Sequence, residues 1–112
     1  RTSASIAFDD GYPPMAPTDA NRALLATYDR ISRDLGLWPV EAVDPSRAGA
    51  ADVSFVAHLV PMLIDGLGLS GTGGHTVHET ADLRMLPVQT KRAALLLHRL
   101  TTGRGAGTRV AK

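Results

Sequence analysis

Residues 61–79 read PMLIDGLGLSGTGGHTVHE, and the interpretation of this stretch decides which fold is expected for the chain. Its centre, residues 66–71, has the spacing G-x-G-x-x-G after a short apolar run, as in dinucleotide-binding loops. His75, His78 and Glu79 follow closely, and imidazole and carboxylate groups are common metal ligands. The stretch could therefore hold a phosphate, hold a metal ion, or only form a turn.

A dinucleotide site needs a strand before the loop, a helix that begins at the third glycine, and an acidic residue about 20 positions further on. A short strand over 61–64 is plausible. The segment after Gly71 contains two more glycines and no apolar period, so it does not predict a helix. The residue about 20 positions on is Lys91. The pattern therefore disfavours nucleotide binding, which would show as thermal stabilisation by a dinucleotide.

A zinc site made only of neighbouring residues is also disfavoured. Zinc needs three or four protein ligands, and the other local candidates are Asp65, Glu79 and Asp82. The chain has no cysteine, and the spacing of His75 and His78 is not that of the helical H-E-x-x-H motif. Spacing alone therefore predicts two histidines in a surface loop.

Composition limits the classes of function. The chain has 112 residues, of which 44% are apolar, and a net charge of +1, which predicts one small globular unit without a broad surface for nucleic acid. No stretch has the roughly 20 apolar residues that span a membrane, and disulfides are excluded because cysteine is absent. The chain begins RTSAS, without a methionine or signal peptide, so we expect a processed or excised segment whose cellular compartment is undetermined.

Two stretches have the period of an amphipathic helix. Thr18 can cap a helix over 18–35, and Gly36 can end it. A helix over 86–100 has Pro87 in its first turn. The positions predicted to face the core are Leu24, Tyr28, Ile31 and Leu35 in the first helix and Ala93, Leu96, Leu97 and Leu100 in the second.

Shorter segments complete an order in which strands alternate with helices. Ile6 and Phe8 share one face at a period of two residues, which is typical of a strand. The predicted segments are a strand over 3–9, a strand over 37–40, a helix over 50–60, a strand over 61–64 and a flexible tail over 103–112. This alternation predicts an α/β layer with parallel strand pairing.

The order of these motifs resembles the C-terminal part of the dizinc exopeptidases and amidohydrolases, the family of glutamate carboxypeptidase, acetylornithine deacetylase, succinyl-diaminopimelate desuccinylase and aminoacylase. The resemblance covers about residues 5–103. The motifs that carry it are Tyr12-Pro13-Pro14-Met15, the helix over 18–35, Gly49-Ala50-Ala51-Asp52, the run 61–64, the glycine-rich loop 66–71, His75-Thr76, Glu79 and the helix over 86–100.

The resemblance implies a fold and a domain organisation. The chain would be the C-terminal portion of an α/β/α catalytic domain of the zinc-exopeptidase type, with one residual strand of the lid, or dimerisation, domain. Residues 1–13 would end the lid domain as a strand and linker, and residues 14–112 would belong to the catalytic domain. The complete protein is expected to form a homodimer.

The resemblance also implies the roles of individual residues. Two zinc ions share a bridging carboxylate and a bridging water in this family, and His75 matches its last zinc ligand. Glu79 matches an acidic position that would orient the ligand or order the loop. Asp52 would have a similar supporting role at the start of a helix, where a carboxylate meets free N–H groups. Ala51 replaces the Ser or Thr that usually precedes this Asp. Arg47 is a candidate to bind a substrate carboxylate.

The expected activity is hydrolysis of an amide bond in a peptide or an N-acyl amino acid. The chain has no H-x-D ligand motif and no Glu-Glu pair for the general base, so we expect the catalytic base and most ligands in an upstream part of the protein. The segment alone is predicted to be inactive and to bind zinc weakly, without nucleic-acid or membrane partners. The alternative is a small stand-alone α/β interaction module without catalysis.

Overall fold

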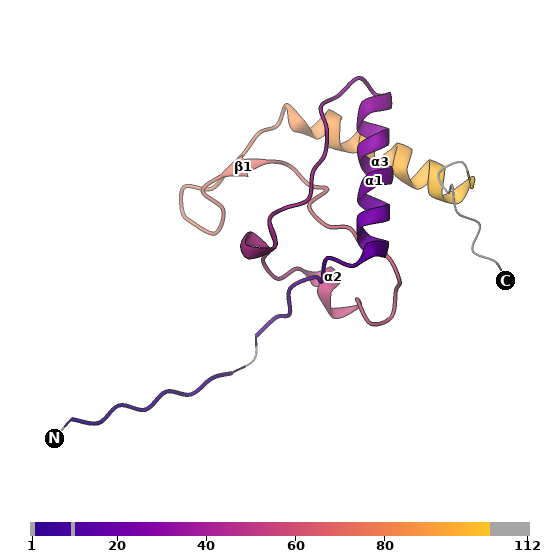
Figure 1. Cartoon of the computed structure of the whole chain (residues 1–112). Helices are drawn as coiled ribbons and strands as arrows, with labels where there is room; N and C mark the ends of the chain where they lie inside the picture. The colour runs from indigo at the N-terminus through magenta and orange to yellow at the C-terminus, as the bar shows by residue number, and fades with distance from the viewer. Residues whose placement is uncertain (1, 10, 104–112) are drawn as a thin grey trace.

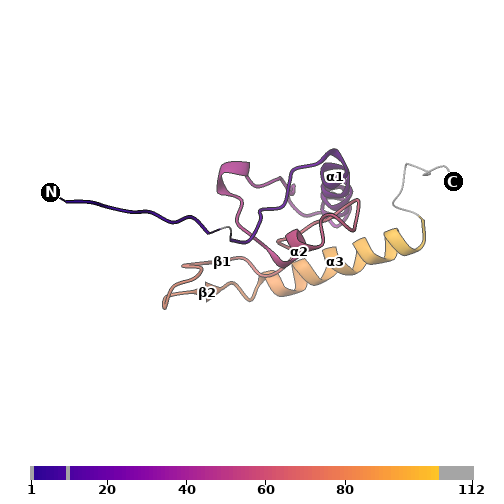
Figure 2. The ribbon, with the colours of Figure 1, turned by 90° about the horizontal axis from the view of Figure 1, so that it is seen from below.

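The computed structural model describes residues 2–9 and 11–103, and its body is built on two long helices that cross each other (Figures 1 and 2). Short elements and loops connect them. The elements are α1 (Asp19–Asp34), the 3₁₀ helix η1 (Pro45–Arg47), α2 (Asp52–Phe55), β1 (Gly71–Thr72), β2 (Thr80–Ala81) and α3 (Met85–Thr101). The fold is therefore mixed α/β, as predicted, but the strands contribute little to it.

Helix α1 confirms the strongest sequence prediction. The Thr18 hydroxyl accepts a hydrogen bond from the Asn21 backbone N–H at 3.1 Å, and Asp19 lies in the first turn. Leu35 caps the other end, and Gly36 follows with φ +70°, a conformation that suits glycine after a helix.

The core lies where α1 meets α3, and it is small. Its buried apolar residues are Leu24, Tyr28, Ile31 and Leu96, with Leu35, Val40, Ile64, Leu67 and Leu95 packed against them. The predicted stripe of α1 is confirmed. The stripe predicted for α3 is wrong in part, because Leu97 and Leu100 are 64% and 46% exposed. Leu96 is buried as predicted, and Leu95 packs against the core beside it.

The segments predicted as strands over 37–40 and 61–64 lie outside the helices and do not pair in a sheet. Their backbones are bound by side chains of α1 instead. The Val40 N–H donates to the Asp29 carboxylate at 2.9 Å, and the Leu63 N–H donates to the Asn21 amide oxygen at 2.7 Å. The prediction of parallel pairing is wrong for the described residues, since their one sheet is the antiparallel pair β1–β2.

Two further sequence predictions fail within the described residues. Residues 3–9 form no strand, and Ile6 and Phe8 are 77% and 86% exposed because no neighbouring strand covers them (Figure 1). The helix predicted over 50–60 is reduced to the single turn α2, followed by turns over 56–59. Apart from Gly103, the predicted tail 103–112 lies outside the described residues.

The molecule is more open than its length suggests. Its radius of gyration is 18.0 Å, whereas about 13 Å is typical of a compact domain of roughly 100 residues. The exposed N-terminal arm and the projecting β1–β2 hairpin account for the extended outline (Figure 2). None of the helices in the described ranges is both long enough and apolar enough to cross a membrane.

Candidate functional site: the hairpin that carries His75

The glycine-rich stretch forms a projecting β-hairpin. β1 and β2 pair in antiparallel register, with Gly71 opposite Ala81 and Thr72 opposite Thr80. The hydroxyls of the two threonines lie 3.0 Å apart across the pair. The connecting loop, residues 73–79, carries the histidines and the glutamate singled out from the sequence.

Hydrogen bonds within the loop fix its path. The Thr76 hydroxyl donates to the Gly73 carbonyl at 2.7 Å and accepts from the His78 N–H at 3.1 Å. The Thr76 N–H also donates to the Gly73 carbonyl, and the Glu79 N–H donates to the Thr76 carbonyl. Thr76 is therefore the residue that organises the turn between the two strands.

The glycines of this stretch serve the hairpin. A Cβ on Gly71 would collide with the carbonyl oxygen of Thr80 in the opposite strand. Gly73 has φ +69°, and a Cβ there would lie 2.8 Å from the His78 carbonyl oxygen. Close backbone approach explains Gly71 and Gly73, and the positive φ of +75° explains Gly66, so two of the three glycines in the G-x-G-x-x-G spacing have a structural reason that involves no phosphate.

His75 occupies an uncommon backbone conformation at the end of the hairpin. Its φ is +64°, which non-glycine residues adopt rarely and which the surrounding loop must enforce. The side chain is exposed, and within residues 2–9 and 11–103 its ring makes no hydrogen bond or ion pair. The loop therefore holds His75 with both ring nitrogens accessible to a ligand.

The other acidic and basic loop residues do not gather around His75. In the part of the chain that the structure describes, no group of three or more His, Cys, Asp or Glu side chains could hold a metal ion. Glu79 lines an open pocket of about 330 Å³ on the hairpin, together with Gly74 and the strand residues. His78 is exposed, in keeping with its predicted surface position.

The connector that leads into the hairpin is anchored at three successive points. Leu67 packs against the core, the Gly68 carbonyl accepts from the Gln89 side chain at 2.9 Å, and the Ser70 carbonyl accepts from the Asp82 N–H at 2.8 Å. The glycine content of this connector favours flexibility, but these three contacts tie it to the rest of the chain. The anchors come from residues later in the chain, which local sequence does not reveal.

Asp82 joins the end of β2 to the start of α3. Its carboxylate accepts from the Arg84 side chain at 2.9 and 2.8 Å and from the Arg84 N–H at 3.0 Å. These bonds to Arg84 hold the pKa of the Asp82 carboxyl below its ordinary value. Asp82 therefore fixes the turn between the hairpin and α3 as an anion.

Arg47 and Asp52 lie on the elements that precede the hairpin. Asp52 is the first residue of α2, as predicted, but Ala51 provides no side-chain cap, and the buried hydroxyl of Ser54 has no hydrogen-bond partner among the described residues. Arg47 ends η1, whose start is capped by the Asp44 carboxylate. Bonds from the Ser46 backbone and hydroxyl lower the pKa of Asp44.

Arg47 lines a groove of about 640 Å³ that is separate from the pocket on the hairpin. The groove is lined by residues of α1, by residues 40–43 after that helix, by residues 63–66 before the hairpin, and by the stretches 14–17 and 45–51. Its apolar wall includes Met15, Leu25, Tyr28, Val40, Val43, Leu63 and Ile64, and its charged residues are Arg22, Glu41, Arg47 and Asp65. The structure thus brings Arg47 to a largely apolar surface and Glu79 to the hairpin, without joining them in one site.

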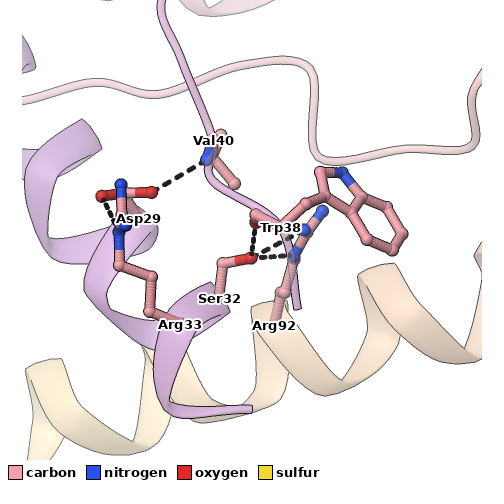
Figure 3. A network of polar contacts seen from close by, with 6 residues as sticks. All are labelled: Asp29, Ser32, Arg33, Trp38, Val40 and Arg92. Atoms are coloured by element: carbon pink, nitrogen blue, oxygen red, sulfur yellow. Dashed lines mark hydrogen bonds and ion pairs between the residues drawn. The ribbon is translucent and has the colours of Figure 1, made fainter. Parts of the chain in front are cut away.

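A buried polar network beside the core was missed by the sequence interpretation (Figure 3). Arg92 of α3 is only 3% exposed. Its guanidinium donates to the Ser32 hydroxyl from Nε and Nη2 and to the Trp38 carbonyl from Nη2, and it stacks 4.8 Å from the Trp38 ring centroid. The sequence did contain a signal for this position, because Arg92 lies four residues before Leu96 and therefore on the helix face that meets the core.

The same network fixes the segment after α1. The Ser32 hydroxyl donates to the Trp38 carbonyl at 2.5 Å, and the Asp29 carboxylate accepts from both Arg33 and the Val40 N–H (Figure 3). These bonds, that from Arg33 first, lower the pKa of the Asp29 carboxyl. Burial raises the pKa of Tyr28, so its phenol remains a neutral donor near pH 7.

Comparison of the chain with protein-family models, with curated proteins and with solved structures found no match.

Proposed function

We propose that this chain is the C-terminal part of the catalytic domain of a zinc-dependent peptidase or amidohydrolase, in which His75 is one ligand of a dizinc site. The complete protein would hydrolyse an amide bond of a peptide or an N-acyl amino acid. The proposal rests first on the order of motifs along the chain, from Tyr12-Pro13-Pro14-Met15 to the helix after Glu79.

The observation that carries the proposal is how His75 is presented. A hairpin with two conformationally required glycines holds this side chain outward in a backbone conformation of φ +64°. A strained conformation that the surrounding loop enforces is typical of functional positions.

His75 has the chemistry of a zinc ligand. A neutral imidazole with an accessible ring nitrogen is a common zinc ligand, and no hydrogen bond of the described chain competes for the His75 ring. Bound zinc would supply Lewis-acid chemistry at a scissile carbonyl. The contribution of this chain is to hold the imidazole in place, and the remaining ligands and the general base would come from the upstream part of the domain.

The apolar surface of the chain supports the existence of that further part. Among the residues that the structure describes, only four apolar side chains are buried, and the groove of about 640 Å³ exposes apolar walls. Large apolar residues that remain exposed include Phe55, Leu59, Met62, Leu83, Leu86, Leu97 and Leu100. Apolar surface of this kind is typical of a packing interface.

Four predictions from the resemblance remain part of the proposal. Glu79 would orient His75 or order its loop, Asp52 would stabilise the start of α2, and Arg47 would bind a substrate carboxylate. Residues 1–13 would end a lid domain through which the complete protein forms a homodimer.

The alternative, a stand-alone interaction module, is favoured by one observation. The contact between α1 and α3 has its own core and a buried Arg92 that finds hydrogen-bond partners within the chain. A stand-alone module would be monomeric, whereas a part of a larger domain would self-associate through its apolar surface. Size-exclusion chromatography over a range of concentrations separates the two, and a strictly monomeric chain would favour the module.

The proposal is tested by titrating the chain alone with zinc in a calorimeter and by assaying the chain alone for amidase activity. We expect binding well below stoichiometric at micromolar zinc and no amidase activity, because one histidine does not make a zinc site. Tight stoichiometric zinc together with turnover would refute it. The coding sequence upstream provides a second check, in which H-x-D, a bridging Asp and a Glu-Glu pair should be found.

A further inference from the structure

Gln89, in the second turn of α3, joins three parts of the chain that are distant in sequence. Its side-chain oxygen accepts from the Tyr28 hydroxyl of α1 and from Arg92 of α3, both at 3.2 Å. Its side-chain nitrogen donates to the carbonyl of Gly68 at 2.9 Å. One amide group therefore connects both helices to the connector before the hairpin.

The buried network fixes the orientation of this amide. A guanidinium can only donate, so the Gln89 atom that faces Arg92 must be the oxygen. Arg92 is itself held by the Ser32 hydroxyl. The NH₂ group of Gln89 must therefore face the opposite side, where the Gly68 carbonyl lies.

The Gly68 carbonyl lies immediately before the strand that leads to His75. Gly68 is followed by Leu69 and Ser70, whose carbonyl is bound by the Asp82 N–H, and β1 begins at Gly71. Between the apolar contact of Leu67 and the bond to Ser70, the Gln89 amide provides the polar anchor that comes from the helical core.

We propose that Gln89 is a positioning residue that fixes the hairpin carrying His75 relative to the α1–α3 core. Its importance for a metal rests on the proposed function, because the position of His75 matters to zinc only if His75 is a ligand. The anchoring of the hairpin is a property of this chain alone and can be measured without zinc.

The test is the substitution Gln89→Glu, which keeps the size of the side chain. One carboxylate oxygen can still accept from Tyr28 and Arg92, while the other opposes the Gly68 carbonyl with no proton between them. We expect the amide hydrogen of Asp82 to exchange about 2- to 10-fold faster at pH 7, the range that corresponds to one net hydrogen bond. The Leu35 amide, which donates to Ile31 in α1, should be unchanged.

Acid provides a signature that a general loss of packing would not give. Protonation gives the introduced carboxyl an O–H that can donate to Gly68, so exchange at Asp82 should return toward that of the unsubstituted chain at the same pH. Tyr28 of α1 and Arg92 of α3 face this group, and the connector 66–70 contributes no titratable side chain. Because Arg92 favours the charged form, recovery is expected below the ordinary glutamate pKa of about 4.3.

Two further variants complete the design. Tyr28→Phe removes a donor to the Gln89 oxygen but leaves the bond to Gly68, so Asp82 should exchange as in the unsubstituted chain once global stability is matched. Gln89→Met introduces no charge and should accelerate Asp82 without recovery in acid. Unchanged exchange at Asp82 in both Gln89 variants, or equal acceleration at Asp82 and Leu35, would overturn the proposal. In that case the proposed role of Gln89 would be wrong even if a longer protein bound zinc normally.

Discussion

Arg92 is the residue on which the contact between the two long helices depends. Its planar guanidinium reaches Ser32, Gln89 and the Trp38 carbonyl at once and stacks on the Trp38 ring. A lysine ammonium group cannot replace a guanidinium at a site where the group stacks on a ring and donates several hydrogen bonds. The side chain therefore specifies how α3 lies against α1.

We predict that Arg92→Lys lowers the free energy of unfolding by about 1–3 kcal/mol, because an ammonium cannot satisfy these acceptors together and leaves buried groups unpaired. Arg33→Lys is the matched control. Arg33 is 59% exposed and, within residues 2–9 and 11–103, its side chain pairs only with Asp29, so Arg33→Lys should lower the free energy of unfolding by no more than about 0.5 kcal/mol. Urea unfolding measures both, and equal losses would contradict the role given to Arg92.

Asp29 makes the stability of the chain depend on pH in acid. Its folded-state pKa is lowered by Arg33 and by the Val40 N–H. The unfolded state therefore binds the proton first, near pH 3.9, and the stabilisation is present above that pH and lost as the pH falls through the folded pKa. Asp44 and Asp82, whose pKa values are also lowered, contribute in the same direction.

Asp29→Asn should therefore flatten the loss of stability between about pH 5 and about pH 2, because the amide does not titrate. The measurement is the free energy of urea unfolding at several pH values for the variant and the unsubstituted chain. An unchanged slope in this range would show that Asp29 is not held as an anion by Arg33 and Val40.

At the scale of elements, α3 has one apolar face that is buried and one that is exposed. Leu96 is buried against α1, whereas Leu97 is 64% exposed, although the two are neighbours in sequence. The proposed function assigns the exposed face, with Leu86 and Leu100, to contact with the rest of a catalytic domain. The two faces can be tested separately in the chain alone.

Leu96→Ala should lower the free energy of unfolding by about 2–4 kcal/mol, because it removes buried methyl groups and leaves a cavity. Leu97→Ala should change it by less than about 0.5 kcal/mol while reducing self-association in sedimentation experiments. The interpretation of α3 would be wrong if Leu97→Ala were as destabilising as Leu96→Ala.

The two long helices could be predicted from sequence, and the hairpin could not. α1 is specified locally, by a Thr18 cap and an apolar period that ends near Gly36. The hairpin depends on pairing between Gly71 and Ala81 across a loop, and its glycines hide the weak strand signal. The segments 37–40 and 61–64 were predicted as strands because periodicity does not show that side chains of α1 bind their backbones.

The candidate site could be predicted from the sequence only in part. His75 was singled out because it matches the last zinc ligand in the resemblance, whereas its backbone conformation and its hairpin could not be predicted from the sequence. Arg92 and Gln89 were missed because their partners are far away in the chain; Ser32 and Arg92, for example, are 60 positions apart. Such contacts follow from the tertiary packing of α1 on α3 rather than from local pattern.

For the molecule as a whole, the central claim is that His75 is one ligand of a zinc site completed by other parts of a longer protein. The open outline and the small core fit this claim. His78 provides the matched control, because it lies in the same exposed loop and carries the same ring.

The most direct test is the zinc content of the longer polypeptide that includes these residues, measured by elemental analysis after dialysis. The account predicts two zinc ions per chain, as the resemblance implies, with His78→Ala unchanged and His75→Ala losing at least one. Equal zinc content in the two variants would contradict the assignment of His75 as a ligand.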